Sequence, residues 1–238
     1  MEVKKDTATK NPIGHWAFDE GRGTIITDLS GNGHDAFIVN QSKSAGEFKY
    51  PVKWVEGRSG KALKYTAEDR QGTSGHVVIP DLGRYDFSGG MTVELWVNFD
   101  KETDPKGLCD IITNMASSNY GPGFRLYYVW KRVVFGSAAR FTRKTYEVRT
   151  NMLEAPLTPG VWQHIAGVYD GSIYKIYLDG EEVAVSKPGL KMTGGYKDIT
   201  IGAFPFGKGR GFRGIIDDVR IYAYPLTARE VLRHAIFD

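Results

Sequence analysis

The chain has 238 residues, 41% of them hydrophobic and 25% charged, a composition that excludes a disordered or fibrous protein. This length corresponds to one domain, since all-β domains commonly run to about 200–250 residues. The formal net charge of +3 by itself indicates no class of partner. A single cysteine, Cys109, excludes an intrachain disulfide framework and a cysteine-based zinc site.

The first eleven residues are polar and rich in lysine, and we expect residues 1–11 to form a disordered leader before a domain over residues 12–238. They contain no apolar segment typical of a signal peptide. No later run approaches the roughly 18 apolar residues of a membrane span, so no membrane association is expected.

Strands dominate the predicted elements. Residues 91–99 alternate strictly between apolar and polar, which predicts a strand with Met91, Val93, Leu95, Val97 and Phe99 on one face. Further strands are predicted, in chain order, over 76–80, 124–130, 133–137, 145–150, 162–169, 173–178, 181–185, 198–202 and 214–223. Only 227–236 predicts a helix, with Thr227 and Glu230 as a capping box.

Two Asp-Gly pairs indicate turns between strands, because glycine readily adopts the positive φ of a type I′ turn. Asp170-Gly171 and Asp179-Gly180 separate three β-rich runs and predict three consecutive antiparallel strands. Short strands at spacings of about 8–12 residues, without alternating helices, predict an all-β sandwich or barrel.

Four segments form an ordered set along the chain. They are His15-Trp16-Ala17-Phe18-Asp19-Glu20-Gly21, Asp28-Leu29-Ser30-Gly31-Asn32-Gly33-His34-Asp35-Ala36, Trp162-Gln163-His164-Ile165-Ala166 with its hairpin, and Gly214-Ile215-Ile216-Asp217-Asp218-Val219-Arg220-Ile221-Tyr222 followed by Pro225-Leu226-Thr227. Together these segments resemble the laminin-G-like family of the concanavalin A-like lectins and glucanases. The resemblance covers nearly the whole chain from about Gly14. It implies an antiparallel jelly-roll sandwich of two sheets, with the first and last strands adjacent and a short C-terminal helix.

The resemblance also implies one structural calcium ion near the junction of the chain ends. Calcium prefers six to eight oxygen ligands from carboxylates, amides and backbone carbonyls. The predicted ligands are Asp19, Gly21, Asn32, His34, Asp217 and Asp218, with Gly21 and His34 contributing carbonyls. The alternative is that Asn32 makes a turn and that Asp217 and Asp218 pair with Arg220 or cap loops. Asp28 and Asp35 are assigned to that simpler role.

The small net charge conceals an uneven distribution of charged residues along the chain. Residues 125–149 contain seven Lys and Arg against one Glu, a net charge of +6, and residues 204–213 add +3, which leaves −6 elsewhere. Aromatic residues interleave with these cations. Flat rings pack on pyranose faces while arginine binds carboxylate or sulfate groups, so the pattern favours an acidic polysaccharide. The predicted ligand-binding residues are Arg125, Tyr127, Trp130, Arg140, Arg143, Tyr146, Arg149 and Arg210.

About half of the residues in 124–130 must face the core, and the pattern does not decide between Tyr127 and Tyr128. Exposed cations on strand edges also prevent aggregation, which is the structural alternative for these arginines.

We therefore expect a non-catalytic, monomeric carbohydrate-binding module with one Ca²⁺, secreted, extracellular or periplasmic as its relatives are. An alternative is a polysaccharide lyase or glycoside hydrolase on the same scaffold, with Arg125, Tyr127, Arg143 and Tyr146 as lyase candidates. The chain has no run of alternating carboxylates such as some jelly-roll glycosidases carry. A protein-binding adhesion domain is the third candidate. Nucleic acid is not expected, because no recognition motif is present.

Overall fold

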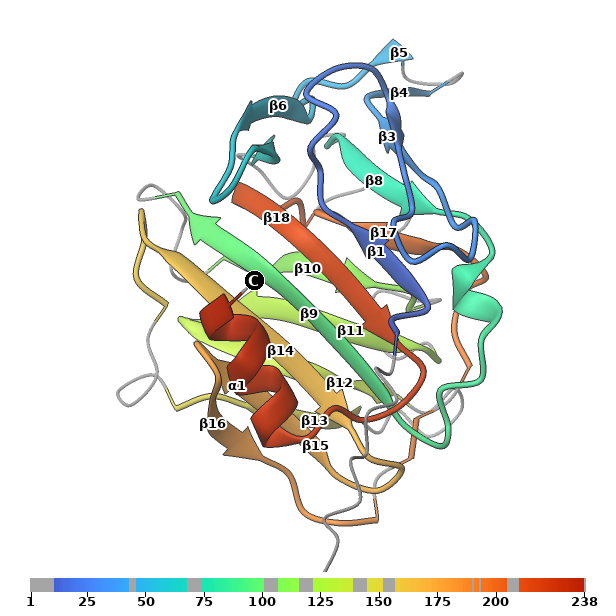
Figure 1. The fold of residues 1–238 in the computed structure, drawn as a ribbon, viewed down its shortest axis with the longest axis vertical. Coiled ribbons are helices and arrows are strands. Elements are labelled where there is room, and N and C mark those ends of the chain that lie inside the picture. The colour runs from blue at the N-terminus through green and yellow to red at the C-terminus, as the bar shows by residue number, and fades with distance from the viewer. Residues whose placement is uncertain are drawn as a thin grey trace, which may run out of the picture.

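The computed structural model describes residues 11–42, 46–67, 74–100, 107–115, 122–138, 145–151, 157–189, 191–192, 194–204 and 210–237. In these ranges the chain forms two eight-stranded antiparallel sheets that pack face to face, as the sequence predicts for a jelly roll (Figure 1). The expected leader lies almost entirely outside the described residues.

The first sheet faces the viewer in Figure 1. Its strands, from one edge to the other, are β16 (Glu181–Val185), β15 (Tyr174–Leu178), β14 (Trp162–Tyr169), β9 (Met91–Phe99), β18 (Arg213–Tyr222), β7 (Lys61–Thr66) and β6 (Lys53–Glu56). An eighth strand, β1 (Gly14–Trp16), pairs with β18, with His15 opposite Arg220. The first and last strands are therefore adjacent, as the resemblance implies.

The second sheet lies behind the first. Its strands, in order, are β13 (Thr145–Arg149), β12 (Arg132–Ala138), β11 (Phe124–Val129), β10 (Cys109–Thr113), β17 (Ile199–Ile201), β8 (His76–Ile79), β3 (Ala36–Val39) and β2 (Ile25–Ile26). The remaining elements are the pair β4 (Gln41–Ser42) and β5 (Gly46–Glu47), a 3₁₀ turn (Leu82–Arg84) and helix α1 (Ala228–Phe237). No helix in these described ranges is long and apolar enough to cross a membrane.

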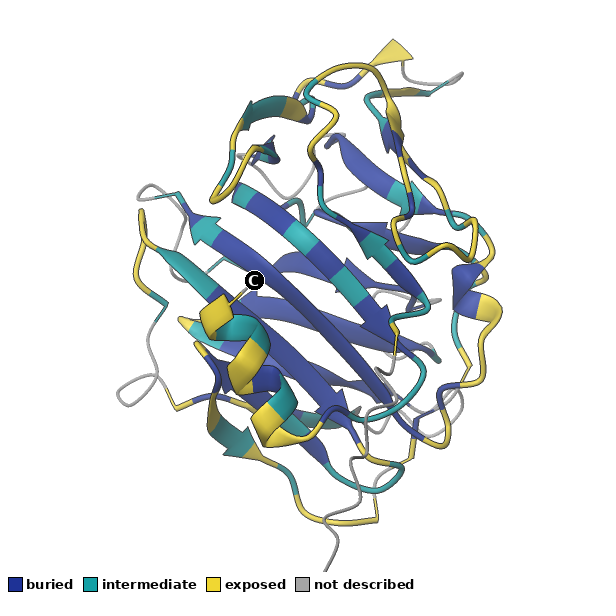
Figure 2. Cartoon of the chain, viewed as in Figure 1, coloured by how far each residue is buried: buried dark blue, intermediate teal, exposed yellow. Residues whose placement is uncertain are grey.

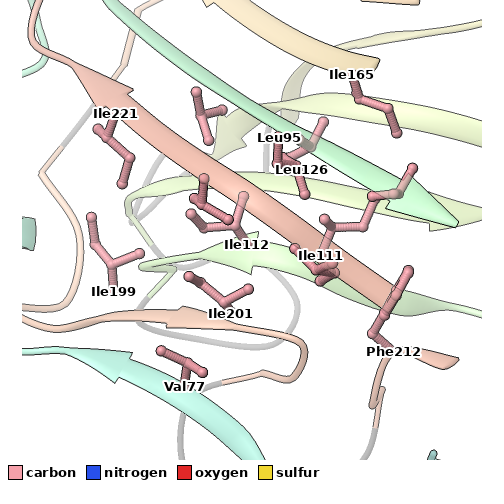
Figure 3. Packing of buried hydrophobic residues seen from close by; sticks show 14 of the residues in the cluster. Val77, Leu95, Ile111, Ile112, Leu126, Ile165, Ile199, Ile201, Phe212 and Ile221 are labelled. Atoms are coloured by element: carbon pink, nitrogen blue, oxygen red, sulfur yellow. The ribbon is translucent and has the colours of Figure 1, made fainter. Parts of the chain in front are cut away.

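The core lies between the two sheets (Figure 3). The five β9 residues predicted to share one face all point into it, so the predicted face is confirmed, and Trp96 lies on the other face. In β11 the core face carries Phe124, Leu126 and Tyr128, and Tyr128 packs against Phe99 with ring centroids 4.9 Å apart. Because successive strand residues point to opposite sides, Arg125 and Tyr127 face outward.

The predicted β14–β15–β16 meander is confirmed, and Asp179 and Gly180 form the β15–β16 turn with φ of 50° and 87°. The capping box of α1 is also present, since the Thr227 N–H donates to Glu230 Oε2 at 2.7 Å. Helix α1 covers part of the outer face of the first sheet, packing Val231 into a small apolar cluster with Val168 and Tyr222 (Figures 1 and 2).

Candidate functional site

The β11–β12 turn, formed by Trp130 and Lys131, projects an aromatic ring into solvent. Trp130 is 58% exposed, whereas most aromatic side chains of the described ranges are buried. Its side chain lines a pocket of about 250 Å³ together with Val129, Arg132 and Arg149. An exposed indole beside two guanidinium groups combines an apolar surface with cationic donors.

The two arginines of this Trp130 pocket differ in how their charges are compensated. Arg149 Nη2 donates to Glu147 Oε1, and this ion pair raises the pKa of the Arg149 guanidinium. The Nε of Arg132 is buried and has no hydrogen-bond partner in the described part of the chain. A buried, unsatisfied donor is costly. Arg132 also lines the pocket, where the rest of its guanidinium can meet an anion from outside the protein.

Polar contacts continue inward from the pocket along the outer face of the second sheet. The Tyr127 hydroxyl donates to Glu147 Oε2 at 2.9 Å. Gly136, on the strand between them, lies opposite Glu147, and a Cβ there would come within 2.5 Å of Glu147. Burial raises the pKa of Tyr127, and the nearby charge of Glu147 raises it further. A phenol with a raised pKa is a poor base at neutral pH.

Arg125 lies at the inner end of these contacts. Its guanidinium stacks over the Tyr127 ring, 4.0 Å from the centroid, and pairs with the fully buried Asp110. The Asp110 N–H donates to the carbonyl of Arg210 at 2.9 Å, so the two basic stretches meet here. Part of their positive charge is therefore neutralised by a carboxylate from outside both stretches.

The structure thus brings some of the eight predicted ligand-binding residues together. Trp130 and Arg149 line the pocket, Tyr127 and Arg125 lie beneath it, and Arg210 reaches Arg125 through its backbone contact with Asp110. Tyr146 packs against the core instead. Arg140 and Arg143 lie outside the described residues.

Three residues important to this face were not predicted. Glu147 was counted only as the lone acid of a basic stretch, and Arg132 only as one of its cations. Asp110 follows Cys109 in a run that the sequence pattern did not identify as a strand. Their roles depend on cross-strand neighbours, which the sequence alone does not give.

Of the predicted calcium ligands, Asp19, Asp217 and Asp218 line a second pocket of about 180 Å³ in the first sheet. Asp217 Oδ2 accepts the Arg58 N–H at 2.9 Å, and Asp19 Oδ1 accepts the Lys61 N–H at 2.9 Å, so both hold the β6–β7 turn. Burial raises the pKa of Asp217 to about 7, opposed by the Arg58 N–H and reinforced by the charge of Asp218.

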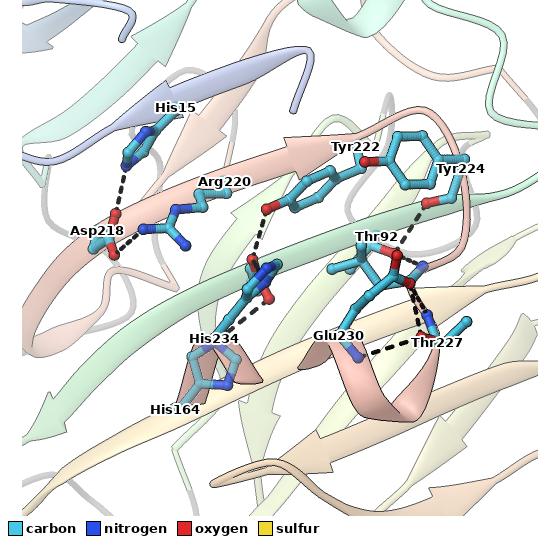
Figure 4. Close-up of polar contacts among 12 residues, drawn as sticks. His15, Thr92, His164, Asp218, Arg220, Tyr222, Tyr224, Thr227, Glu230 and His234 are labelled. Atoms are coloured by element: carbon cyan, nitrogen blue, oxygen red, sulfur yellow. Dashed lines mark hydrogen bonds and ion pairs between the residues drawn. The ribbon is translucent and has the colours of Figure 1, made fainter. Parts of the chain in front are cut away.

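Asp218 lies between the side chains of His15 and Arg220. It contacts His15 Nε2 at 2.6 Å and accepts a hydrogen bond from Arg220 Nη2 at 2.8 Å (Figure 4). Burial opposes its ionisation, but His15 and Arg220 outweigh this and lower its pKa. The alternative assignment of Asp218 to a pair with Arg220 is therefore confirmed.

Asn32 and His34 belong to a different place, the loop between β2 and β3. The Asn32 amide donates to the carbonyl of Ile13, before β1, whereas Asp19 follows β1. Asp28 organises this loop by accepting the N–H groups of His15 and His34, as assigned from the sequence. The His34 carbonyl accepts the Trp16 indole N–H.

The six predicted ligands therefore do not converge on one point. The described ranges hold no group of three or more His, Cys, Asp or Glu side chains arranged to bind a metal ion. Gly21 follows Asp19 in the loop after β1, with φ of 66°. As arranged, the six residues do not all surround one calcium ion, so only a subset of them could hold it, and the ion stays a prediction.

A third polar cluster lies beneath α1. Glu94, on the outer face of β9, is 1% exposed and accepts hydrogen bonds from the Tyr222 hydroxyl at 2.9 Å and His234 Nδ1 at 2.8 Å. His164 Nε2 lies 3.5 Å from its other oxygen. Figure 4 shows Tyr222, His164 and His234 of this cluster, near the sheet and the helix. Burial opposes ionisation of Glu94, but the two imidazoles outweigh it and lower its pKa to about 2.

Comparison with known proteins identifies the class. Residues 71–232 match the family model of the concanavalin A-like lectin/glucanases superfamily, and the chain belongs to this family. No curated protein matches the sequence.

Solved structures share the fold. Domain 4 of AbnA, a GH43 extracellular arabinanase from Geobacillus stearothermophilus, solved in complex with arabinotriose, has a TM-score of 0.69 and 22% identity, covering 94% of this chain and 98% of that domain. The binding domain of botulinum neurotoxin serotype G has a TM-score of 0.68 and 15% identity, and that of neurotoxin DC with SialylT has 0.68 and 13%. The match covers 94% of this chain but 50% of each toxin domain.

Proposed function

We propose that the chain is a non-catalytic carbohydrate-binding module that recognises anionic polysaccharide at the Trp130 pocket. The observation that carries this proposal is the exposed indole of Trp130 beside Arg132 and Arg149. The indole packs against the apolar face of a sugar ring. The guanidinium groups bind a carboxylate or sulfate on the same sugar through charge-assisted hydrogen bonds.

The structural relatives support a binding role of this general kind. Domain 4 of AbnA is described with arabinotriose and the neurotoxin DC domain with SialylT. Neither likeness gives a sugar for this chain. The preference for an acidic ligand rests on the cations around Trp130 alone.

A lyase on the same scaffold requires a base near the sugar, and Tyr127 and Tyr146 were the tyrosine candidates. Tyr146 packs against the core. The Tyr127 hydroxyl donates to Glu147 and its pKa is raised, which favours a structural role for the phenol. Binding without turnover is therefore the better use of this face. Secretion, a monomeric state and one calcium ion complete the proposal as predictions from the family resemblance.

An affinity-gel screen tests the function directly. The chain is run through gels containing neutral arabinan, polygalacturonate or dextran sulfate, and its migration is compared with a gel without polysaccharide. We expect retardation by one or both acidic polymers, reduced in Trp130→Ala and Arg149→Ala. Unchanged migration in both acidic gels, or new reducing ends or unsaturated products after incubation, would overturn the proposal.

A further inference from the structure

The β11–β12 turn has an unusual backbone. Trp130 has φ of 53° and Lys131 has φ of 58°, so both central residues of a two-residue hairpin turn are left-handed. In the described ranges this is the one place where two successive residues other than glycine have positive φ. A Cβ makes this conformation unfavourable, which is why such turns prefer Asn-Gly or Asp-Gly.

The same chain contains a turn with the preferred residues. Asp179 and Gly180 connect β15 to β16 with φ of 50° and 87°. With Trp-Lys in this conformation, the β11–β12 turn is less stable than it would be with Asn-Gly. Local strain of this kind concentrates at functional sites, where the side chains are needed for something other than the turn itself.

The side chains in and beside this turn provide an aromatic ring and positive charges that a ligand can contact. Trp130 and Lys131 are both exposed, and the buried Nε of Arg132 has no partner in the described part of the chain. Arg149, in contrast, already shares Glu147. No acidic side chain is paired with Lys131 or Arg132 among the described residues. Arg132 lines the pocket and Lys131 lies beside it in the turn, so these two carry the uncompensated positive charge there.

We propose that Lys131 and Arg132 determine specificity, holding the oxyanion of a single sugar residue whose ring stacks on Trp130. This inference rests on the proposed function and deepens it. The pocket, at about 250 Å³, is smaller than the roughly 300–1,000 Å³ that takes a drug-sized ligand, which suits one sugar residue. The shared chemistry is a carboxylate or sulfate, which arginine binds through two parallel N–H groups.

The test uses three variants of the full chain and one control. They are Arg132→Gln, Lys131→Ala, the double exchange Trp130→Asn with Lys131→Gly, and Lys53→Ala on the exposed edge of the first sheet. Affinity for polygalacturonate and for dextran sulfate is measured for each, together with the melting temperature.

We expect Arg132→Gln to weaken binding about 10-fold or more and Lys131→Ala a few-fold, with the Lys131 effect shrinking at high salt. Lys53→Ala should bind as the native chain does. The double exchange should abolish binding while raising the melting temperature by about 2–4 °C, because it relieves the strained turn. Tighter binding to polygalacturonate identifies a carboxylate ligand, and tighter binding to dextran sulfate identifies a sulfate.

Two failures are distinguishable. If the native chain binds neither acidic polymer, the proposed function is wrong. If the native chain binds but Arg132→Gln, Lys131→Ala and the double exchange bind equally well, the function stands and the inference is overturned. If the double exchange binds weakly but has a lower melting temperature than the native chain, backbone strain at this turn does not mark the binding site.

Discussion

Two hairpin turns of the same chain make opposite use of the same backbone geometry. The Asp179–Gly180 turn has the residues that its dihedral angles favour and lies against α1, where a Cβ on Gly180 would come within 2.6 Å of Leu232. The Trp130–Lys131 turn has residues that its angles disfavour and carries an exposed ring. The first turn completes the fold, whereas the second departs from the local rule beside cations suited to a ligand.

The outer faces of the two sheets, next to these turns, also differ in whether their polar groups are covered by the protein. On the first sheet, beneath α1, Glu94 Oε1 accepts hydrogen bonds from Tyr222 and His234, and Oε2, which has no hydrogen bond in the described ranges, lies 3.5 Å from His164 Nε2. On the second sheet, Arg132 lies at a pocket with an unsatisfied donor. The polar cluster around Glu94 is covered by α1, whereas Arg132 lines a pocket that a ligand can enter.

The largest expected effect tests the cluster covered by α1. Glu94→Gln removes a carboxylate whose pKa falls from 4.5 to about 2 on folding. A lowered folded-state pKa stabilises above the unfolded value, so the variant should lose about 3 kcal/mol at neutral pH. Urea unfolding from pH 7 to pH 2 measures this. The native chain should lose the advantage as the pH falls through about 4.5 towards 2, and a constant difference across that range would contradict the assignment.

Removal of the predicted calcium ion is expected to have the next largest effect on stability. A ligand present at 100 times its dissociation constant stabilises the folded state by about 2.7 kcal/mol, so a chelator should lower the melting temperature by several degrees. An unchanged melting temperature, with no metal in the purified protein, would remove the ion from the account.

Two substitutions compare the two places where the predicted ligands lie. If all six residues serve one ion, both Asp19→Asn and Asn32→Ala should abolish the response to chelator. A response lost in one variant and kept in the other would confine the site to one of these places.

Gly180→Ala tests the favoured turn. The left-handed backbone alone should cost about 1–2 kcal/mol, and the approach to Leu232 adds to this. Gly189→Ala is a matched control, because Gly189 also has positive φ (88°) but nothing within 4 Å of an added Cβ. Thermal unfolding should show a larger loss for Gly180→Ala. Equal losses in the two variants would mean that contact with α1 does not matter.

Tyr127→Phe should have the smallest effect. It removes the hydroxyl that donates to Glu147, at a cost of about 1 kcal/mol in unfolding free energy. Glu147 still pairs with Arg149, so affinity for an acidic polymer should change less than 3-fold or so. A large loss of affinity with unchanged stability would show instead that Tyr127 touches the ligand.

The parts of the fold predictable from sequence were those fixed by local rules. The alternation of β9, the Asp179–Gly180 turn and the capping box at Thr227 each depend on a few neighbouring residues, and all are present. Several shorter strands outside these patterns, such as β3 and β10, were not predicted. They are fixed by pairing with distant strands rather than by their own sequence.

The candidate site was less predictable for the same reason. Packing of Tyr128 against Phe99 decides which face of β11 is outward, and this contact joins the two sheets. The pairing of Arg125 with Asp110 likewise depends on the register of β10 and β11. No turn signal marks Trp130–Lys131, because the residues there oppose the turn that they form.

The measurement closest to the central claim is calorimetric titration of the native chain and Trp130→Ala with polygalacturonate and with neutral arabinan in one buffer. Because buried aromatic anchors contribute about 2 kcal/mol or more to binding, we expect the variant to bind the acidic polymer about 30-fold more weakly. The native chain should bind that polymer more tightly than arabinan. Equal affinity of the native chain for both polymers, or equal affinity of the two proteins, would contradict recognition of an acidic sugar at Trp130.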